Sequence, residues 1–267
     1  NSSDTVGRYL MDSTGTTVVA LIPQLMHGIA HNEDGVGGLH LYIPWWLDNK
    51  KLDFARGYHF EIWGGRGMPG YGFMGGIHKY NALRAGANGA DRPNGGGGYG
   101  RQLKDDYRRL YGAVVGFSGR GEMVARRENY CEIDPRVVDK YGIPVLRFNV
   151  RWSDQEYDQV KHMQETAREI IDELGGIQLS PMPTKEQGYG ILPPGEIIHE
   201  VGVTRMGHDP RSSVLNAYCQ SHDIKNLFVV DGGPFVSQAH KNPTWTILAL
   251  SWRASDFIVE QRNKGNL

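Results

Sequence analysis

The sequence predicts an α+β fold, in which an antiparallel sheet with helices is followed by a C-terminal α/β segment. Three observations carry this prediction. Apolar and polar side chains alternate along 143–152, as they do in a strand with one buried and one polar face. The next residues, 153–174, have the apolar stripe of an amphipathic helix. Near the C-terminus, the apolar run 226–231 leads through two glycines to a second helical pattern.

Composition limits the kinds of partner to expect. The chain has 267 residues, enough for one large or two modest domains, with 39% hydrophobic and 22% charged residues. A net charge of −1 gives no reason to expect nucleic acid or an anionic membrane. No stretch approaches the roughly 20 apolar residues of a membrane span. The two cysteines, Cys131 and Cys219, imply no disulfide framework.

The first half of the chain changes character at residue 64. Two strand-like runs, "GLHLYIPWWL" and "GYHFEIW", lie within 38–63. Glycine then dominates 64–100, where the entropy cost disfavours any regular element. A long loop of this kind is usually functional or mobile. Its aromatic residues fit a lid or an assembly surface, and a plain surface insert fits equally well.

Two further strands are expected at 112–123 ("GAVVGFSGRGEM") and 143–152 ("IPVLRFNVRW"). In the second strand, the polar side chains either line a substrate pocket or meet solvent. The apolar side chains are expected to be buried, and these are Leu146, Phe148, Val150 and Trp152.

The helix at 153–174 has clear ends. Ser153 and Glu156 form the pattern of a capping box, and Gly175-Gly176 stops the helix. Its stripe is expected to pack in the core, and it comprises Val160, Met163, Ala167, Ile170, Ile171 and Leu174. An irregular connection follows at 180–195.

The C-terminal segment predicts a buried strand at 226–231, ending at Asp231 beside two glycines. A carboxylate in that position is typical of a nucleotide-cofactor contact. In the helix that follows, Asn242 suits the N-cap and Pro243 the first turn. That helix is apolar on most sides, so we expect it to be buried.

Three stretches carry a family resemblance: "HEVGVTRMGHDPRSSVLN" (199–216), "HDIKNLFVVDGGPF" (222–235) and "NPTWTILALSWRASDFI" (242–258). Together they resemble the C-terminal region of the glucose–methanol–choline (GMC) flavin oxidoreductases. Residues 1–12 look like the family's link between flavin and substrate domains, and 129–156 look like a sheet strand and the turn after it. The text is most similar to bacterial gluconate, fructose and glycoside 3-dehydrogenases.

The resemblance implies FAD as cofactor and a sugar, sugar acid, glycoside or related polyol as substrate. It implies that His199 is the base that takes the hydroxyl proton, because a neutral imidazole does this near neutral pH. Asn242 would hold the alkoxide without competing as a base. Flavin contacts are expected from Asp231, Gly232, Asn242, Pro243 and Thr244. Gln238 and His240 are weaker candidates for substrate contact.

The resemblance also divides the chain. Residues 1–14 would be the linker from the flavin domain, 15–198 the substrate-binding domain with its glycine-rich loop 64–100, and 199–267 the catalytic, FAD-contacting segment. No G-x-G-x-x-G fingerprint follows a strand, so the N-terminal FAD-binding part is expected elsewhere in the protein.

Several further expectations depend on this division. The first residues have neither an initiating Met nor a signal pattern, which suggests a fragment or processed chain, inactive by itself. A dehydrogenase is expected rather than an oxidase, with a cytochrome or other electron-acceptor subunit as partner. Periplasm and cytoplasm both stay open as compartments.

Two positions depart from the family pattern. Val203-Thr204 stands where many members have Gly-Thr, and Ser13 stands where a histidine commonly follows Leu-Met-Asp.

Two other functions remain as alternatives. A metal-binding hydrolase could use His208-Asp209, Cys219 and His222-Asp223, but no pair has ligand spacing. A non-catalytic carbohydrate-binding module would explain the glycines and aromatics, but not the spacing of His199 and Asn242. Trp45 and Trp46 fit either sugar stacking or the core.

Overall fold

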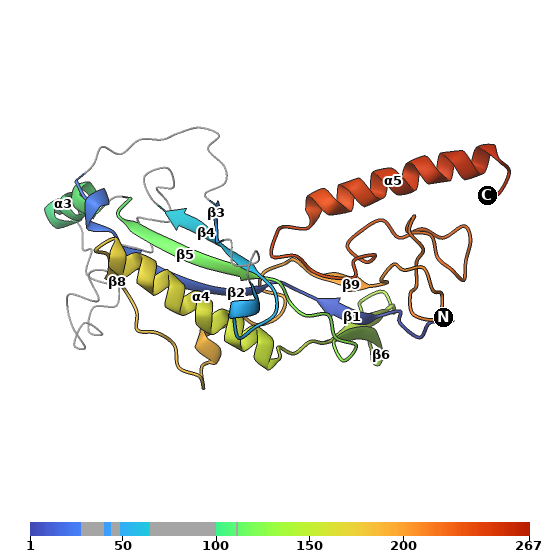
Figure 1. Ribbon diagram of the computed structural model, residues 1–267, viewed down its shortest axis with the longest axis horizontal. Helices are drawn as coiled ribbons and strands as arrows, with labels where there is room; N and C mark the ends of the chain where they lie inside the picture. Colours follow the sequence, from blue (N-terminus) through green and yellow to red (C-terminus); the bar gives the residue numbers. More distant parts are fainter. Residues whose placement is uncertain (28–39, 44–48, 65–99, 111) are drawn as a thin grey trace.

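A computed structural model describes residues 1–27, 40–43, 49–64, 100–110 and 112–267. The molecule is elongated, with a five-stranded sheet toward one end and a four-stranded sheet toward the other (Figure 1). Both sheets are antiparallel, so the α+β prediction is confirmed. The glycine-rich residues 65–99 and the tryptophans at 45 and 46 lie outside the described residues.

The five-stranded sheet has the order β3-β4-β5-β2-β8. Its strands are β2 (Thr14–Leu21), β3 (His40–Tyr42), β4 (Tyr58–Gly64), β5 (Val114–Gly121) and β8 (Ile177–Gln178). Strands β3, β4 and β5 confirm the predictions for 38–63 and 112–123. Strand β2 was not predicted, although its run of valines and threonines suits a pleated, buried strand.

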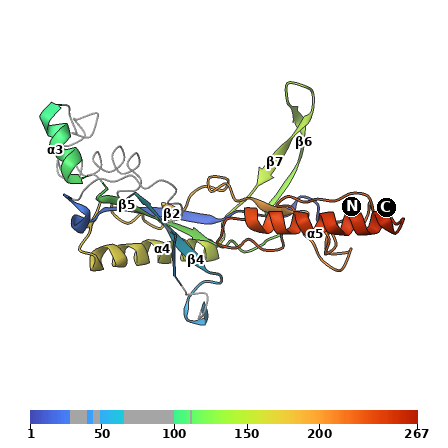
Figure 2. The same cartoon turned by 90° about the horizontal axis from the view of Figure 1, so that it is seen from above.

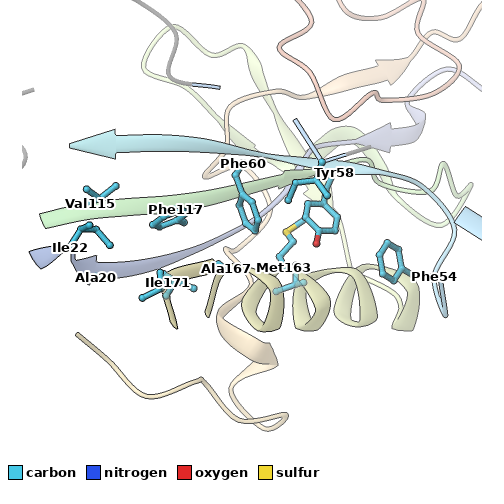
Figure 3. Close-up of a cluster of buried hydrophobic side chains, with 13 residues drawn as sticks. Ala20, Ile22, Phe54, Tyr58, Phe60, Val115, Phe117, Met163, Ala167 and Ile171 are labelled. Atoms are coloured by element: carbon cyan, nitrogen blue, oxygen red, sulfur yellow. The ribbon is translucent and has the colours of Figure 1, made fainter. Parts of the chain in front are cut away.

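Helix α4 (Asp154–Glu173) covers one face of this sheet and confirms the predicted amphipathic helix. The Ser153 N–H donates to the Glu156 carboxylate at 2.7 Å, as in a capping box, and the Ser153 hydroxyl donates to the same carboxylate at 2.5 Å. Figure 3 shows Phe60 and Phe117 of the sheet above Met163 and neighbouring helix residues, which together make the main core.

The predicted stripe of α4 is buried except at its end. Val160, Met163, Ala167 and Ile171 are fully buried, whereas Leu174 at the C-cap is 44% exposed. Gly175 follows with φ 63°, the left-handed conformation that favours glycine at a helix end.

The four-stranded sheet has the order β7-β6-β1-β9. Its strands are β1 (Arg8–Met11), β6 (Tyr130–Val138), β7 (Pro144–Asn149) and β9 (Val201–Val203). Strand β7 was predicted, but its burial was predicted wrongly, because Leu146 and Phe148 are 54% and 62% exposed. The β6–β7 hairpin projects from the body (Figure 2), and most of the surface of these two side chains is exposed.

Helix α5 (Thr244–Asn263) corrects two predictions. Pro243, not Asn242, is its N-cap, and no side chain caps it. Only Ala254 is buried, while Trp245 is 84% and Trp252 74% exposed. The helix stands away from the sheets along most of its length (Figures 1 and 2). Phe257 stacks on the Tyr218 ring, with ring centroids 4.1 Å apart, but most of the apolar surface of the helix is exposed.

The predicted buried strand 226–231 was also wrong. Phe228 forms only an isolated bridge with Gln220, and Leu227 and Val230 are exposed. Among the described residues, no helix or strand packs on the solvent-facing side of this segment.

One further helix, α3 (Gly100–Leu110), was not predicted. No helix in the described part of the chain has the length and apolar character needed to cross a membrane.

Candidate active site

The site is built around Asp12 and Ser13, the two residues that join β1 of one sheet to β2 of the other. The Asp12 side chain is only 2% exposed. Its carboxylate accepts backbone N–H groups from Ser13 at 2.7 Å, Gly195 at 2.9 Å and His199 at 3.2 Å. Asp12 therefore ties the segment that carries His199 to the joint between the sheets.

A second set of contacts holds the His199 ring. Its Nδ1 lies 3.4 Å from the Ser13 hydroxyl, which in turn accepts a hydrogen bond of 3.1 Å from Gln238 Nε2. Ser13 and Gln238 are completely buried. The Gln238 Oε1 is buried as well and has no hydrogen-bond partner among the described residues, so it remains available to a donor from a ligand.

Burial lowers the pKa of His199 below its ordinary value. The negative charges of Asp12 and Glu61 oppose this shift, and the positive charge of Arg120 adds to it. The imidazole is therefore neutral near pH 7, which is the form that accepts a proton.

Three charged or titratable side chains cover the face of the five-stranded sheet opposite α4. We call His59, Glu61 and Arg120 the polar wall. His59 is fully buried and Glu61 is 7% exposed. Glu61 lies 3.4 Å from the Arg120 Nε and 3.8 Å from the His59 Nε2. The wall is thus a connected group whose charges act on His199.

The segment leading to α5 lies against this wall. The ring centroid of His240 is 5.5 Å from that of His59, and burial lowers the pKa of His240 to about 4. The Lys241 ammonium lies 3.7 Å from the centroid of the Tyr42 ring, on β3. Burial lowers the pKa of Lys241 to about 8, although Glu61 opposes the shift. His199, Gln238, His240 and Lys241 therefore converge on one face of the sheet.

Sequence reasoning identified three of these residues, His199, Gln238 and His240. It missed Asp12, Lys241 and the whole polar wall. Part of the wall had a signal in "GYHFEIW", where His59 and Glu61 alternate with core residues Tyr58 and Phe60. The sequence instead led us to consider the strand at 143–152 as the one whose polar side chains line a substrate pocket.

The expected cofactor residues Asp231 and Gly232 lie beside β9. Gly202 N–H donates to the Gly232 carbonyl at 3.0 Å, and Gly233 N–H donates to Asp231 Oδ1 at 2.7 Å. A cavity of about 390 Å³ opens here, lined in part by Asp231, Gly232 and Thr204. The expected contacts at the start of α5 lie elsewhere, because Asn242 and Thr244 are exposed and Pro243 is the N-cap.

Thr204, Asp231, Gly232 and Gly233 line one part of this cavity, which we call the polar cradle. Its side chains suit a polar group of a cofactor. The Thr204 hydroxyl is buried and lacks a hydrogen-bond partner among the described residues. A Cβ added at Gly233 would lie 2.3 Å from that hydroxyl, so only glycine fits beside it. An unpaired hydroxyl next to a carboxylate and two glycines suits the ribose hydroxyls of a dinucleotide.

Backbone strain flanks His199 and β9. Ile198, directly before His199, has φ 59°, and Val203 has φ 66°. β-Branched residues rarely adopt this conformation, which costs on the order of 1–3 kcal/mol. Position 203 is where the family commonly has glycine, so the strain gives a physical reason for that preference. Gly202 is required, since a Cβ there would lie 2.2 Å from the Tyr9 carbonyl oxygen.

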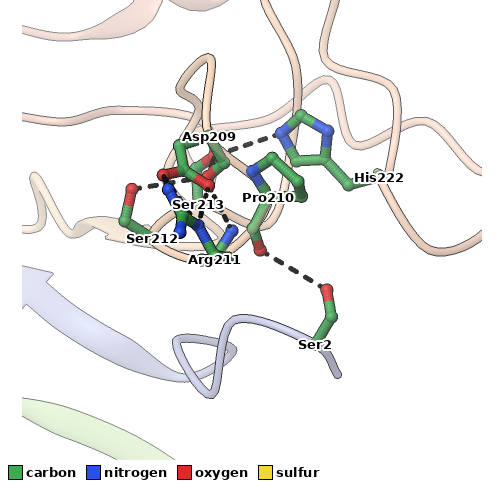
Figure 4. A network of polar contacts seen from close by, with 7 residues as sticks. All are labelled: Ser2, Asp209, Pro210, Arg211, Ser212, Ser213 and His222. Carbon is green, nitrogen blue, oxygen red and sulfur yellow. Dashed lines mark hydrogen bonds and ion pairs between the residues drawn. The ribbon is translucent and has the colours of Figure 1, made fainter.

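The residues considered for a metal site form turns instead. Figure 4 shows Asp209 paired with Arg211, and the Ser213 hydroxyl 3.1 Å from His222 Nε2. No group of three His, Cys, Asp or Glu side chains suited to a metal occurs in the described part of the chain. The metal-binding alternative therefore has no support there.

Comparison with known proteins agrees with the resemblance. Residues 125–251 match the family described as GMC oxidoreductase. The gluconate 2-dehydrogenase flavoprotein of Pantoea cypripedii is 30% identical over 202 residues, which are 74% of this chain and 33% of that protein. The 2-methyl-1,2-propanediol dehydrogenase of Mycolicibacterium austroafricanum is 36% identical over 144 residues, 52% of this chain and 24% of that protein.

A solved structure supports the fold. Formate oxidase from Aspergillus oryzae RIB40, studied for modification of its FAD, superposes with a TM-score of 0.59 at 13% identity. The match covers 98% of this chain and 48% of the formate oxidase chain. The chain thus spans about a third or less of the two dehydrogenases and about half of this oxidase.

Proposed function

We propose that this chain, which matches the GMC oxidoreductase family over residues 125–251, is part of an FAD-dependent enzyme that oxidises a hydroxyl group of a sugar, sugar acid or glycoside. The observation that carries the proposal is the setting of His199. Its ring is neutral, half-buried and held by Ser13, and the charges of Glu61 and Arg120 in the polar wall act on it. FAD is the cofactor of this family, and the relative from Pantoea is named a flavoprotein.

His199 removes the hydroxyl proton of the substrate in this proposal. A bound FAD would supply the acceptor for the hydride that leaves the same carbinol carbon. The Asn242 amide donates a hydrogen bond to the alkoxide oxygen as it forms. Gln238 Oε1, the buried acceptor without a partner, and His240 contact other substrate hydroxyls. Asp12 keeps the His199 backbone in place throughout.

Two groups of residues hold the cofactor in this proposal. Asp231 and Gly232 line the polar cradle. Asn242, Pro243 and Thr244 lie at the start of α5, where free N–H groups and the helix dipole favour negative charge.

The rest of the enzyme lies outside this chain in the proposal. Residues 1–14 lead from an N-terminal FAD-binding part, 15–198 form the substrate-binding domain, and 199–267 contribute to the cofactor site. The enzyme is a dehydrogenase that passes electrons to a cytochrome or another acceptor subunit, and the chain is inactive without its FAD-binding part. The name of the Pantoea relative supports a polyhydroxy substrate.

The decisive experiment is His199→Ala in the full-length enzyme. Removing the base should slow anaerobic flavin reduction by roughly 10²- to 10⁴-fold. Stopped-flow absorbance measures this rate, and the flavin spectrum before mixing checks that FAD is retained. His208→Ala is the matched control, since His208 is an exposed histidine in a turn of the same segment. Equal rates in wild type and His199→Ala would remove His199 from the mechanism.

A further inference from the structure

Among the described groups at the polar wall and the segment against it, one positive charge has no separate counter-ion. Glu61 and Arg120 of the polar wall neutralise each other at 3.4 Å. The Asp12 carboxylate is occupied by three backbone N–H groups. Burial keeps His240 neutral near pH 7, because its pKa is about 4. Lys241 therefore adds a positive charge for which no separate counter-ion exists among these groups.

The Lys241 ammonium is shielded from solvent. Its nitrogen has no hydrogen-bond partner among the described residues, and its contact there is the face of the Tyr42 ring. A ring face attracts a cation but accepts none of its three N–H hydrogens in a normal hydrogen bond. A buried ammonium in this condition is costly unless a ligand supplies an acceptor, and an anionic acceptor also compensates its charge.

The position of Lys241 relates it to the reacting group. Tyr42, which it covers, stacks on His59 of the polar wall with ring centroids 5.7 Å apart. The Glu61 carboxylate between them acts on both His199 and Lys241. His199 and Lys241 therefore both lie within the electrostatic reach of Glu61, and the proposal places one ligand in contact with both groups.

We propose that Lys241 binds a substrate carboxylate, so that the substrate is a sugar acid rather than a neutral sugar or polyol. This inference rests on the proposed function. A carboxylate forms a charge-assisted hydrogen bond with the ammonium, while a neutral hydroxyl leaves the charge uncompensated. The polar wall then faces the hydroxyl groups between the carboxylate and the carbon that is oxidised.

Two matched substrate pairs test the proposal in the full-length FAD enzyme. Gluconate is compared with glucitol and glucuronate with glucose, since the members of each pair differ mainly in the acid group. Anaerobic flavin reduction gives kcat/KM for each. Wild type should favour the acid of at least one pair, and Lys241→Met should lower that preference by about tenfold or more. Lys241→Arg, which keeps the charge, should retain most of the preference.

A surface lysine provides the control. Lys140, at the exposed turn between β6 and β7, also covers an aromatic ring, that of Tyr141 at 4.9 Å. Lys140→Met removes the same charge far from the polar wall and should leave the acid preference as in wild type.

A pH profile gives a readout that loss of packing would not. Lys241 is charged below pH 8 and loses its proton as the pH rises through about 8. KM for the acid should therefore rise above that pH in wild type, but not in Lys241→Arg. The groups that share its surroundings are Glu61 and His59 on β4, Tyr42 on β3, Arg120 on β5 and the neighbouring His240.

The outcomes separate this inference from the proposed function. Flavin reduction by glucitol or glucose without a preference for the acid overturns carboxylate binding and leaves the oxidation reaction standing. An acid preference that survives Lys241→Met assigns the carboxylate to another residue and also overturns the inference. Failure of all four compounds to reduce the flavin counts against both the proposed substrate class and this inference.

Discussion

Asp12 combines two effects on the proposed base. Its carboxylate accepts the His199 backbone N–H, and its negative charge opposes the fall in the pKa of His199 caused by burial. The same charge stabilises the imidazolium that forms when His199 takes a proton. Asp12 is a positioning residue, because it acts through His199 and not on the substrate.

Asp12→Asn removes the charge and keeps the outline of the side chain, at the loss of the hydrogen bond from Gly195 N–H to Oδ2. Without the carboxylate, the pKa of His199 should fall further, so the base stays neutral to lower pH and the acid limb of kcat/KM moves downward. The weaker base should also lower the plateau rate by roughly tenfold or more. A pH series of flavin reduction in the full-length enzyme measures both. Asp209→Asn, on the surface beside Arg211, is the control. An acid limb that stays fixed would contradict the electrostatic effect.

Helix α4 has a fully buried capping glutamate. The Glu156 carboxylate accepts hydrogen bonds from Ser153 and from the backbone N–H of Val124, at 2.9 Å. It thereby joins the start of α4 to the chain leaving β5. The residue is 1% exposed, so its loss leaves buried donors without acceptors.

Glu156→Ala should lower the free energy of unfolding by about 1–3 kcal/mol. Glu165→Ala on the same helix is the comparison, because Glu165 makes only an exposed ion pair with Lys161, worth about 0.3–0.5 kcal/mol. Thermal denaturation of the two variants alongside wild type measures the difference. Equal melting temperatures for both would mean that the capping box contributes nothing beyond a surface ion pair.

The same helix shows why some elements could be predicted from the sequence. Its cap, stripe and glycine stop are local signals, and the sheet it needed for burial lies within the chain. The burial of β7 and α5 depends on what covers them, and local sequence cannot say where the covering residues lie. Motif spacing similarly predicted His199, whereas the polar wall arises from strand pairing between His59 and Arg120, which are far apart in sequence.

At the scale of the whole molecule, apolar side chains gather where the described chain provides no cover. They lie on α5, at Trp245 and Trp252, and on β7, at Leu146 and Phe148. A helix with so much exposed apolar surface is unusual for a soluble domain. We propose that the FAD-binding part of the protein covers α5.

Hydrogen exchange of the full-length protein tests this arrangement. Covered α5 should exchange its amides as slowly as α4, because both helices would then open only with the surrounding fold. Mass spectrometry of peptides from 244–263 and 154–173 gives the two rates. Rapid exchange over α5, with α4 protected, would show that the helix lacks a permanent partner even in the complete protein.

The short joint at Asp12 and Ser13 has a consequence for engineering chimeras. Since β1 and β2 belong to different sheets, this joint is a tempting crossover point for exchanging halves between related enzymes. We expect it to tolerate no change in length, however. One inserted residue would shift the register of β2 by one position, so that its side chains would exchange faces of the sheet. Val18 would leave the core and Thr17 would enter it. A viable splice must therefore leave the residue count between Met11 and Thr14 untouched.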